Sequence, residues 1–147
     1  MKDFTTFFFI LICITIFYVY LENKAADVTY VKTHNVEFLV RNLPDKEEAS
    51  LLLSKIRKRL IDLVDHTSKE IKEKDEKTDH LKSLKRLKKN FRPNNITESS
   101  PGNKYTSYSI NKGEKIVFCL RSKETDKLVD INTMMFVAIH ELAHLMT

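Results

Sequence analysis

The sequence is poor in cysteine and has no internal repeat. Of its two cysteines, Cys13 lies inside an uncharged apolar run, so only Cys119 is left for the rest of the chain. A single thiol cannot form an intradomain disulfide, and neither cysteine has the spacing of a metal-binding pair. A disulfide scaffold and a cysteine-ligated metal site are therefore excluded.

The composition is that of one small folded domain. Hydrophobic residues make up 42% and charged residues 31% of the 147 residues, which is too apolar for a wholly disordered chain. A chain of this length does not hold two substantial cores. The formal charge of +5 is compatible with nucleic acid, with anionic lipid or with solubility alone, so it selects no function.

The N-terminal segment carries no charge between Phe4 and Leu21. A helix of this length spans about 27 Å, close to the hydrocarbon thickness of a bilayer. We therefore predict a single-pass anchor over residues 1–23, a membrane localisation and the lipid bilayer as a partner. A cleaved signal peptide is the alternative, disfavoured because the run exceeds a usual signal core and LENKAADV offers a poor cleavage site. Lysines flank both ends, so the orientation stays open.

The remainder divides into a linker with a short strand over residues 24–44 and a domain over residues 45–147. The strand is Val36 to Val40, where apolar residues alternate. Asp45 and Glu48 then form a capping-box pattern before a helix that runs to His66 or slightly beyond. Apolar residues recur along this helix at three and four positions: Ala49, Leu52, Leu53, Ile56, Leu60, Leu63 and Val64.

A second helix is predicted from Asp79 to Asn90, with a narrow apolar stripe of Leu81, Leu84 and Leu87. Residues 69–79 before it alternate in charge and predict an exposed helix extension or a connection. Its remaining surface is strongly basic, which is compatible with phosphate binding. No aromatic residues are interleaved, so nucleic acid is disfavoured as a partner and a solvated helix face is favoured.

A loop and a hairpin are predicted next. The stretch RPNNITESSPGNKYTS is dense in turn residues and predicts a loop. After it, Tyr105 to Ile110 and Glu114 to Leu120 are rich in aromatic and β-branched residues and are separated by Asn-Lys-Gly. This pattern predicts two antiparallel strands.

The last predicted helix starts near Asn132, capped by Asp130 or Asn132, and carries the motif His-Glu-Leu-Ala-His. His140 and His144 lie four residues apart, so they project from one helix face and can both reach one Zn²⁺. Glu141 lies about 100° round the helix, where its carboxylate suits a general base acting on water. Residues available for burial are Met135, Phe136, Ile139, Ala143 and Met146.

A chance pair of structural histidines is the alternative to a metal site. The neighbours of His140, Glu141 and His144 are all uncharged, so these three would be lone polar groups on a mostly apolar helix. Burying such groups without a role is costly. The metal-site interpretation is therefore favoured, with His140 and His144 as zinc ligands and Glu141 as the catalytic residue.

The segment TSYSINKGEKIVFCLRS followed by DINTMMFVAIHELAHLMT resembles zinc metallopeptidases of the WLM type, in particular those of large DNA viruses. The resemblance covers about the last fifty residues. It implies a zincin-like fold, a zinc cofactor and a peptide or protein substrate. It also implies that the segment Glu114 to Leu120 pairs with an extended peptide by strand addition.

The sequence departs from this type in two respects. WLM-type proteins share a third histidine several residues beyond the second, whereas this sequence stops at Thr147. We therefore expect an incomplete site, in a truncated product or with a ligand supplied from elsewhere, and the spacing of His34, His66 and His80 recommends none of them. The predicted anchor also disfavours a nuclear DNA-repair role.

Together these features predict an α+β chain with an N-terminal transmembrane helix and a small zincin-like domain built from helices, a β-hairpin and a C-terminal active-site helix. The predicted function is that of a membrane-anchored zinc metallopeptidase, in which metal-activated water attacks a peptide bond. The rival hypothesis is a non-catalytic, membrane-tethered remnant whose basic helix binds an acidic partner or anionic lipid. The sequence does not indicate an oligomeric state.

Overall fold

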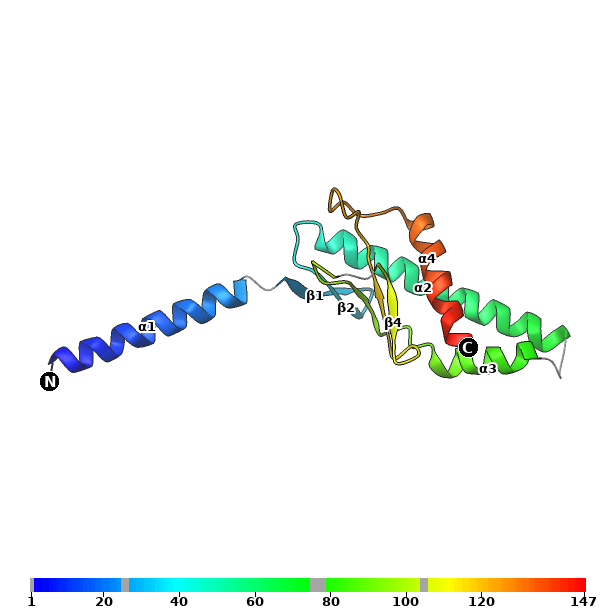
Figure 1. Ribbon diagram of the computed structural model, residues 1–147, viewed down its shortest axis with the longest axis horizontal. Coiled ribbons are helices and arrows are strands. Elements are labelled where there is room, and N and C mark those ends of the chain that lie inside the picture. The colour runs from blue at the N-terminus through cyan, green and yellow to red at the C-terminus, as the bar shows by residue number, and fades with distance from the viewer. Residues whose placement is uncertain (1, 25–26, 75–78, 104–105) are drawn as a thin grey trace.

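The computed structural model describes residues 2–24, 27–74, 79–103 and 106–147 and shows an α+β chain, as the sequence predicts (Figure 1). The first helix, α1 (Lys2–Lys24), is drawn in blue. Its segment Phe4–Leu21 is long and apolar enough to cross a membrane, and none of it is buried. The helix is therefore a candidate membrane span, although a signal sequence has the same properties.

The hairpin that follows has two strands, β1 (Val28–Thr33) and β2 (Val36–Arg41), paired antiparallel throughout. The sequence predicted β2 but missed β1, which lies in the range assigned to the linker. Only Val31 of β1 is buried, so the strand has too little alternation to be recognised. His34 and Asn35 form the turn with φ of 49° and 63°, a left-handed conformation that asparagine tolerates.

Helix α2 (Lys46–Lys74) lies at the centre of the domain and packs against the hairpin and the two later helices. It extends past His66, so the charged stretch up to Lys74 is a helix extension. All seven predicted core residues are buried except Leu63, which is partly buried against the core. The predicted capping box is wrong, because the Asp45 carboxylate hydrogen-bonds Arg121 through one oxygen and its other oxygen has no partner.

Helix α3 (Asp79–Asn90) has the predicted bounds and buries Leu84 and Leu87. It packs against α2 and against the last turn of the chain. Its lysines and arginine are exposed.

The second sheet has three strands, β3 (Ile96–Glu98), β4 (Tyr108–Ile110) and β5 (Lys115–Phe118), in the order β3-β5-β4. The predicted hairpin is confirmed as the antiparallel pair of β4 and β5, with shorter strands than expected and with Tyr105 outside the described residues.

Strand β3 lies inside the predicted loop and pairs parallel to β5. Three residues among turn formers carry no readable period, yet both Ile96 and Glu98 are buried. The segment that looked most like a loop therefore contributes to the core.

The last elements are α4 (Ile131–Ala143) and the single turn η1 (His144–Met146). The buried residues of these two elements are Met134, Ala138, Glu141, Leu142 and Leu145. The set predicted for burial is wrong in part, because Phe136 and Ile139 are 80% and 46% exposed and Ala143 is exposed, whereas Met135 and Met146 are partly buried against the core. Apolar residues occur on every side of this helix, so the sequence pattern does not distinguish the side that faces the core.

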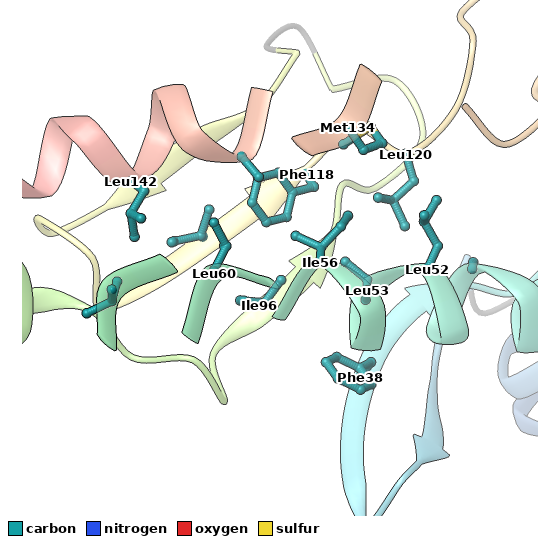
Figure 2. Packing of buried hydrophobic residues seen from close by; sticks show 14 of the residues in the cluster. Phe38, Leu52, Leu53, Ile56, Leu60, Ile96, Phe118, Leu120, Met134 and Leu142 are labelled. Carbon is teal, nitrogen blue, oxygen red and sulfur yellow. The ribbon is translucent and has the colours of Figure 1, made fainter. Parts of the chain in front are cut away.

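One hydrophobic core joins these elements. Figure 2 shows Phe38 of β2, residues of α2, Ile96 of β3, Phe118 of β5, and Met134 and Leu142 of α4 in one cluster. Helix α4 is thereby held by one face against α2 and the sheet. Its other face remains open.

Candidate metal centre

The site begins with the cap that starts α4. The Asp130 side chain accepts hydrogen bonds from the backbone amides of Asn132 and Thr133, so Asp130 is the cap of the two predicted alternatives. The Thr133 hydroxyl also donates to this carboxylate, and these hydrogen bonds lower the pKa of Asp130 below its usual value. The cap fixes the first turn, from which the two histidines follow at a set rotation.

His140 and His144 converge on the exposed face of α4 and η1. Their Nε2 atoms lie 3.1 Å apart, and their rings are 4.7 Å apart in an edge-to-face arrangement. The four-residue spacing predicted this convergence. Two nitrogens bound to one tetrahedral zinc lie about 3.4 Å apart, given Zn–N distances of about 2.0–2.1 Å. The pair therefore fits zinc by donor type and by separation.

Two imidazoles supply only half of a tetrahedral shell. Across the described ranges, no group of three or more His, Cys, Asp or Glu side chains is close enough to hold a metal. His34 instead contacts Ser54, and His66 lies 3.7 Å from Glu70. The structure thus brings none of His34, His66 and His80 to the pair, and the third ligand that the sequence left open is not found among the described residues.

Glu141 differs from the two histidines in its surroundings. It is 7% exposed, whereas both histidines are exposed. Among the residues that the structure describes, none hydrogen-bonds its carboxylate. The residue as a whole is buried, but neither carboxylate oxygen is among the described buried atoms that lack a hydrogen-bond partner, so the carboxylate keeps contact with solvent.

The turn that carries His144 is secured by α3 and by the β4–β5 turn. The Asn90 side chain donates a hydrogen bond to the Leu145 carbonyl, and Leu145 is fully buried. Gly113 has φ of 97°, and a Cβ there would lie 2.6 Å from the Asn90 carbonyl oxygen and 2.9 Å from Leu145. Only glycine fits this contact without displacement. The sequence identified Gly113 as a turn residue but gave no sign that it packs beneath the site.

The chain entering α4 is held by a buried ion network. Arg121 donates to Glu98 and to Asp45, both at 2.7 Å, and its side chain is 4% exposed. Its hydrogen bond lowers the pKa of the Asp45 carboxyl below its usual value. Burial alone would lower the pKa of Arg121, but the bonds to Asp45 and Glu98 outweigh it and raise the pKa. Sequence reasoning missed this network because its members are far apart in the chain.

The strand expected to bind peptide is not available in the way the sequence predicted. Strand β5 is the central strand and pairs with β3 on one side and β4 on the other. An added strand therefore has no edge of β5 to use. The edge strands of this sheet are β3, which also packs against β2, and β4.

Comparison with known proteins bears directly on this site. The WLM domain family matches residues 31–147, a range that contains the end of β1, all of β2 to β5, helices α2 to α4 and the histidine pair. The chain belongs to the WLM domain family. An uncharacterized protein of Acanthamoeba polyphaga mimivirus is 38% identical over 139 residues, which is 92% of this chain and 68% of the relative. No solved structure matches the chain. The family match confirms the resemblance carried by the last fifty or so residues and extends it toward the N-terminus as far as the end of β1.

Proposed function

We propose that this WLM domain is a zinc-dependent peptidase domain of the His-Glu-x-x-His type, held at a membrane by α1. The observation that carries the proposal is the 3.1 Å approach of the two Nε2 atoms on an exposed helix face. Glu141 supports it, because it follows His140 directly and its carboxylate has no hydrogen-bond partner among the described residues. The family match and the candidate span Phe4–Leu21 agree with it.

Each residue has a distinct part in the proposed reaction. When bound, zinc supplies Lewis acidity that polarises a carbonyl and makes water a nucleophile at neutral pH. His140 and His144, whose Nε2 atoms lie 3.1 Å apart, would hold the metal. Glu141 accepts the proton that the attacking water loses, and it later delivers that proton to the leaving amine.

The proposed substrate is a peptide in extended conformation. Strand β4 has one unpaired edge in the described sheet, and an extended peptide pairs with such an edge through backbone hydrogen bonds. We also propose that the domain has the zincin-like fold that the family motif implies.

A third zinc ligand from outside the described residues completes the proposed site. Until it is supplied, only His140 and His144 would hold the metal, and we expect weak zinc binding and little or no hydrolysis by a single copy of the chain. Loosely held metal neither lowers the pKa of water nor aligns it with a carbonyl.

The test uses the full chain and a version extended so that a histidine follows His144 by several residues. Cleavage of a fluorogenic peptide mixture is measured with zinc and with chelator. We expect activity in the extended version, its loss in Glu141→Gln with zinc retained, and no loss in Glu124→Gln, an exposed control. An extended version that binds zinc but is inactive, or full activity in Glu141→Gln, would contradict the proposal.

A second candidate function has one specific observation in its favour. Lys82, Lys85, Arg86 and Lys89 lie on one face of α3 opposite the buried leucines, and all four are exposed. Of these, Lys82 pairs with Asp79. A non-catalytic tether that binds anionic lipid through this face would show salt-sensitive binding without hydrolysis.

A further inference from the structure

The exposed face of α4 carries more than the histidine pair. Phe136, His140 and His144 follow one another at four-residue intervals, and Ile139 and Ala143 form the adjoining row. All five are exposed, with Phe136 at 80% and Ile139 at 46%. The small side chain of Ala143 lies beside Phe136, Ile139 and the two histidines and leaves room for the close approach of another helix.

We propose that two copies of this chain bind one zinc ion between their α4 helices, with His140 and His144 of each copy as the four ligands. The proposal rests on the same histidine pair as the proposed function, and it adds a second copy as the source of the missing ligands. It concerns regulation of the site, because a four-nitrogen shell leaves no open position for water or substrate.

The two-fold symmetry of a dimer is also a symmetry of tetrahedral zinc coordination. Two identical chains associate around a two-fold axis, so each contributes the same surface patch. A tetrahedron also has two-fold axes, each of which relates two pairs of ligands. A zinc ion on the axis therefore receives one convergent pair from each copy, and both pairs already have a near-tetrahedral separation of 3.1 Å.

The size of the apolar patch makes the association depend on zinc. A stable protein interface buries about 1,200–2,000 Å² in total. Phe136 and Ile139 are the two large exposed apolar side chains of this face, and they cover only a small part of that area. The metal must supply the remaining binding free energy, while the two apolar side chains seal its surroundings from water.

The test is sedimentation of the full chain in detergent micelles, with zinc and with chelator. Any association through α1 is present in both samples and cancels in the comparison. We expect zinc to double the protein mass, with one zinc ion per two chains, and to tighten the dimer at least about 100-fold. His140→Ala and His144→Ala should each remove the zinc effect, whereas His80→Ala, an exposed histidine on α3, should not.

The apolar contacts are tested separately. Phe136→Ala should weaken the zinc-dependent dimer about tenfold, and Tyr30→Ala, which removes a 70% exposed aromatic side chain on β1, should leave it unchanged. Circular dichroism checks that each variant is folded, as expected for exposed positions.

The outcomes separate this proposal from the proposed function. One zinc ion per chain at unchanged mass, lost in His140→Ala, would overturn the bridged dimer and leave the peptidase site standing. Zinc binding that is unaffected by His140→Ala and His144→Ala would overturn both. A zinc-dependent dimer that survives these substitutions would place the metal elsewhere and overturn the bridge.

Discussion

Two helices of this chain, α1 and α4, both expose apolar side chains, but they do so differently. The span in α1 is apolar on every side and none of it is buried. Helix α4 buries Met134, Ala138 and Leu142 and exposes apolar residues only on the face that bears the histidines. Exposure all round is typical of a helix surrounded by lipid, whereas an exposed stripe beside metal ligands is typical of a surface that meets a specific partner.

The largest effect is expected when charges are placed in α1. Ile10→Lys with Ile14→Lys puts two ammonium groups in the middle of the span, at a cost of about 5–7 kcal/mol for insertion. We expect the wild-type chain to stay with membranes in alkaline carbonate and the double variant to be released. The matched control is Ile10→Leu with Ile14→Leu, which should behave as wild type.

Two results would contradict the interpretation of α1 as a retained membrane anchor. An intact wild-type chain in the soluble fraction would exclude a retained anchor. A shortened wild-type chain would identify the segment as a cleaved signal sequence.

The next largest effect should separate the two faces of α4. Leu142→Ala removes a buried side chain and leaves a cavity, so we expect the free energy of unfolding to fall by about 2–5 kcal/mol. Ile139→Ala on the open face should change it by less than about 0.5 kcal/mol. Urea unfolding in detergent micelles measures both. Equal losses would mean that the open face is packed against something in the folded chain.

How much of α4 was predictable follows from this contrast. The helix and the convergence of His140 and His144 depend on local spacing, and the sequence predicted both, while it narrowed the cap to Asp130 or Asn132. The core-facing side was not predictable, because the helix has apolar residues on every side. Only its packing against α2 and the sheet determines which of them are buried.

Strands β1 and β3 show a second limit of sequence reasoning. Each pairs with a segment elsewhere in the chain and has few residues with which to show a period. Strand β3 is recognised only in the structure, where it pairs parallel to β5. The sequence of β5 does not show which strands lie next to it. The Asp45 capping box failed for a related reason, since a distant arginine competes for the same carboxylate.

A smaller effect is expected at the contact beneath His144. Gly113→Ala introduces strain at a positive φ and a clash with Asn90 and Leu145, which should lower the free energy of unfolding by about 1–3 kcal/mol. Gly102→Ala is a matched control, because its φ is also positive at 73° but nothing lies within 4 Å of the added Cβ. The difference between the two isolates the packing contact. Zinc affinity should fall in Gly113→Ala alone, and equal affinities would show that this contact does not position His144.

The smallest effect is expected at Asp45, whose partner Arg121 lies in the segment before α4. Asp45→Asn removes one partner of the buried Arg121 and should cost about 1–2 kcal/mol at neutral pH. Because the folded pKa of Asp45 is lowered, its contribution is present above the unfolded value of about 3.9 and is lost as pH falls through the folded value. The Asn variant should therefore approach wild-type stability below about pH 4. A constant difference from pH 7 to pH 3 would contradict this assignment.

The pairing of Asp45 with Arg121 also has a consequence for synthesis, because these residues are 76 positions apart. At a translation rate of about 5–20 residues per second, roughly 4–15 s pass between the two residues leaving the catalytic centre of the ribosome. During that interval α2 has the preceding hairpin of β1 and β2 to pack against, but it lacks Arg121 and helix α4. The part of the apolar stripe of α2 that packs against α4 therefore stays uncovered for seconds during synthesis.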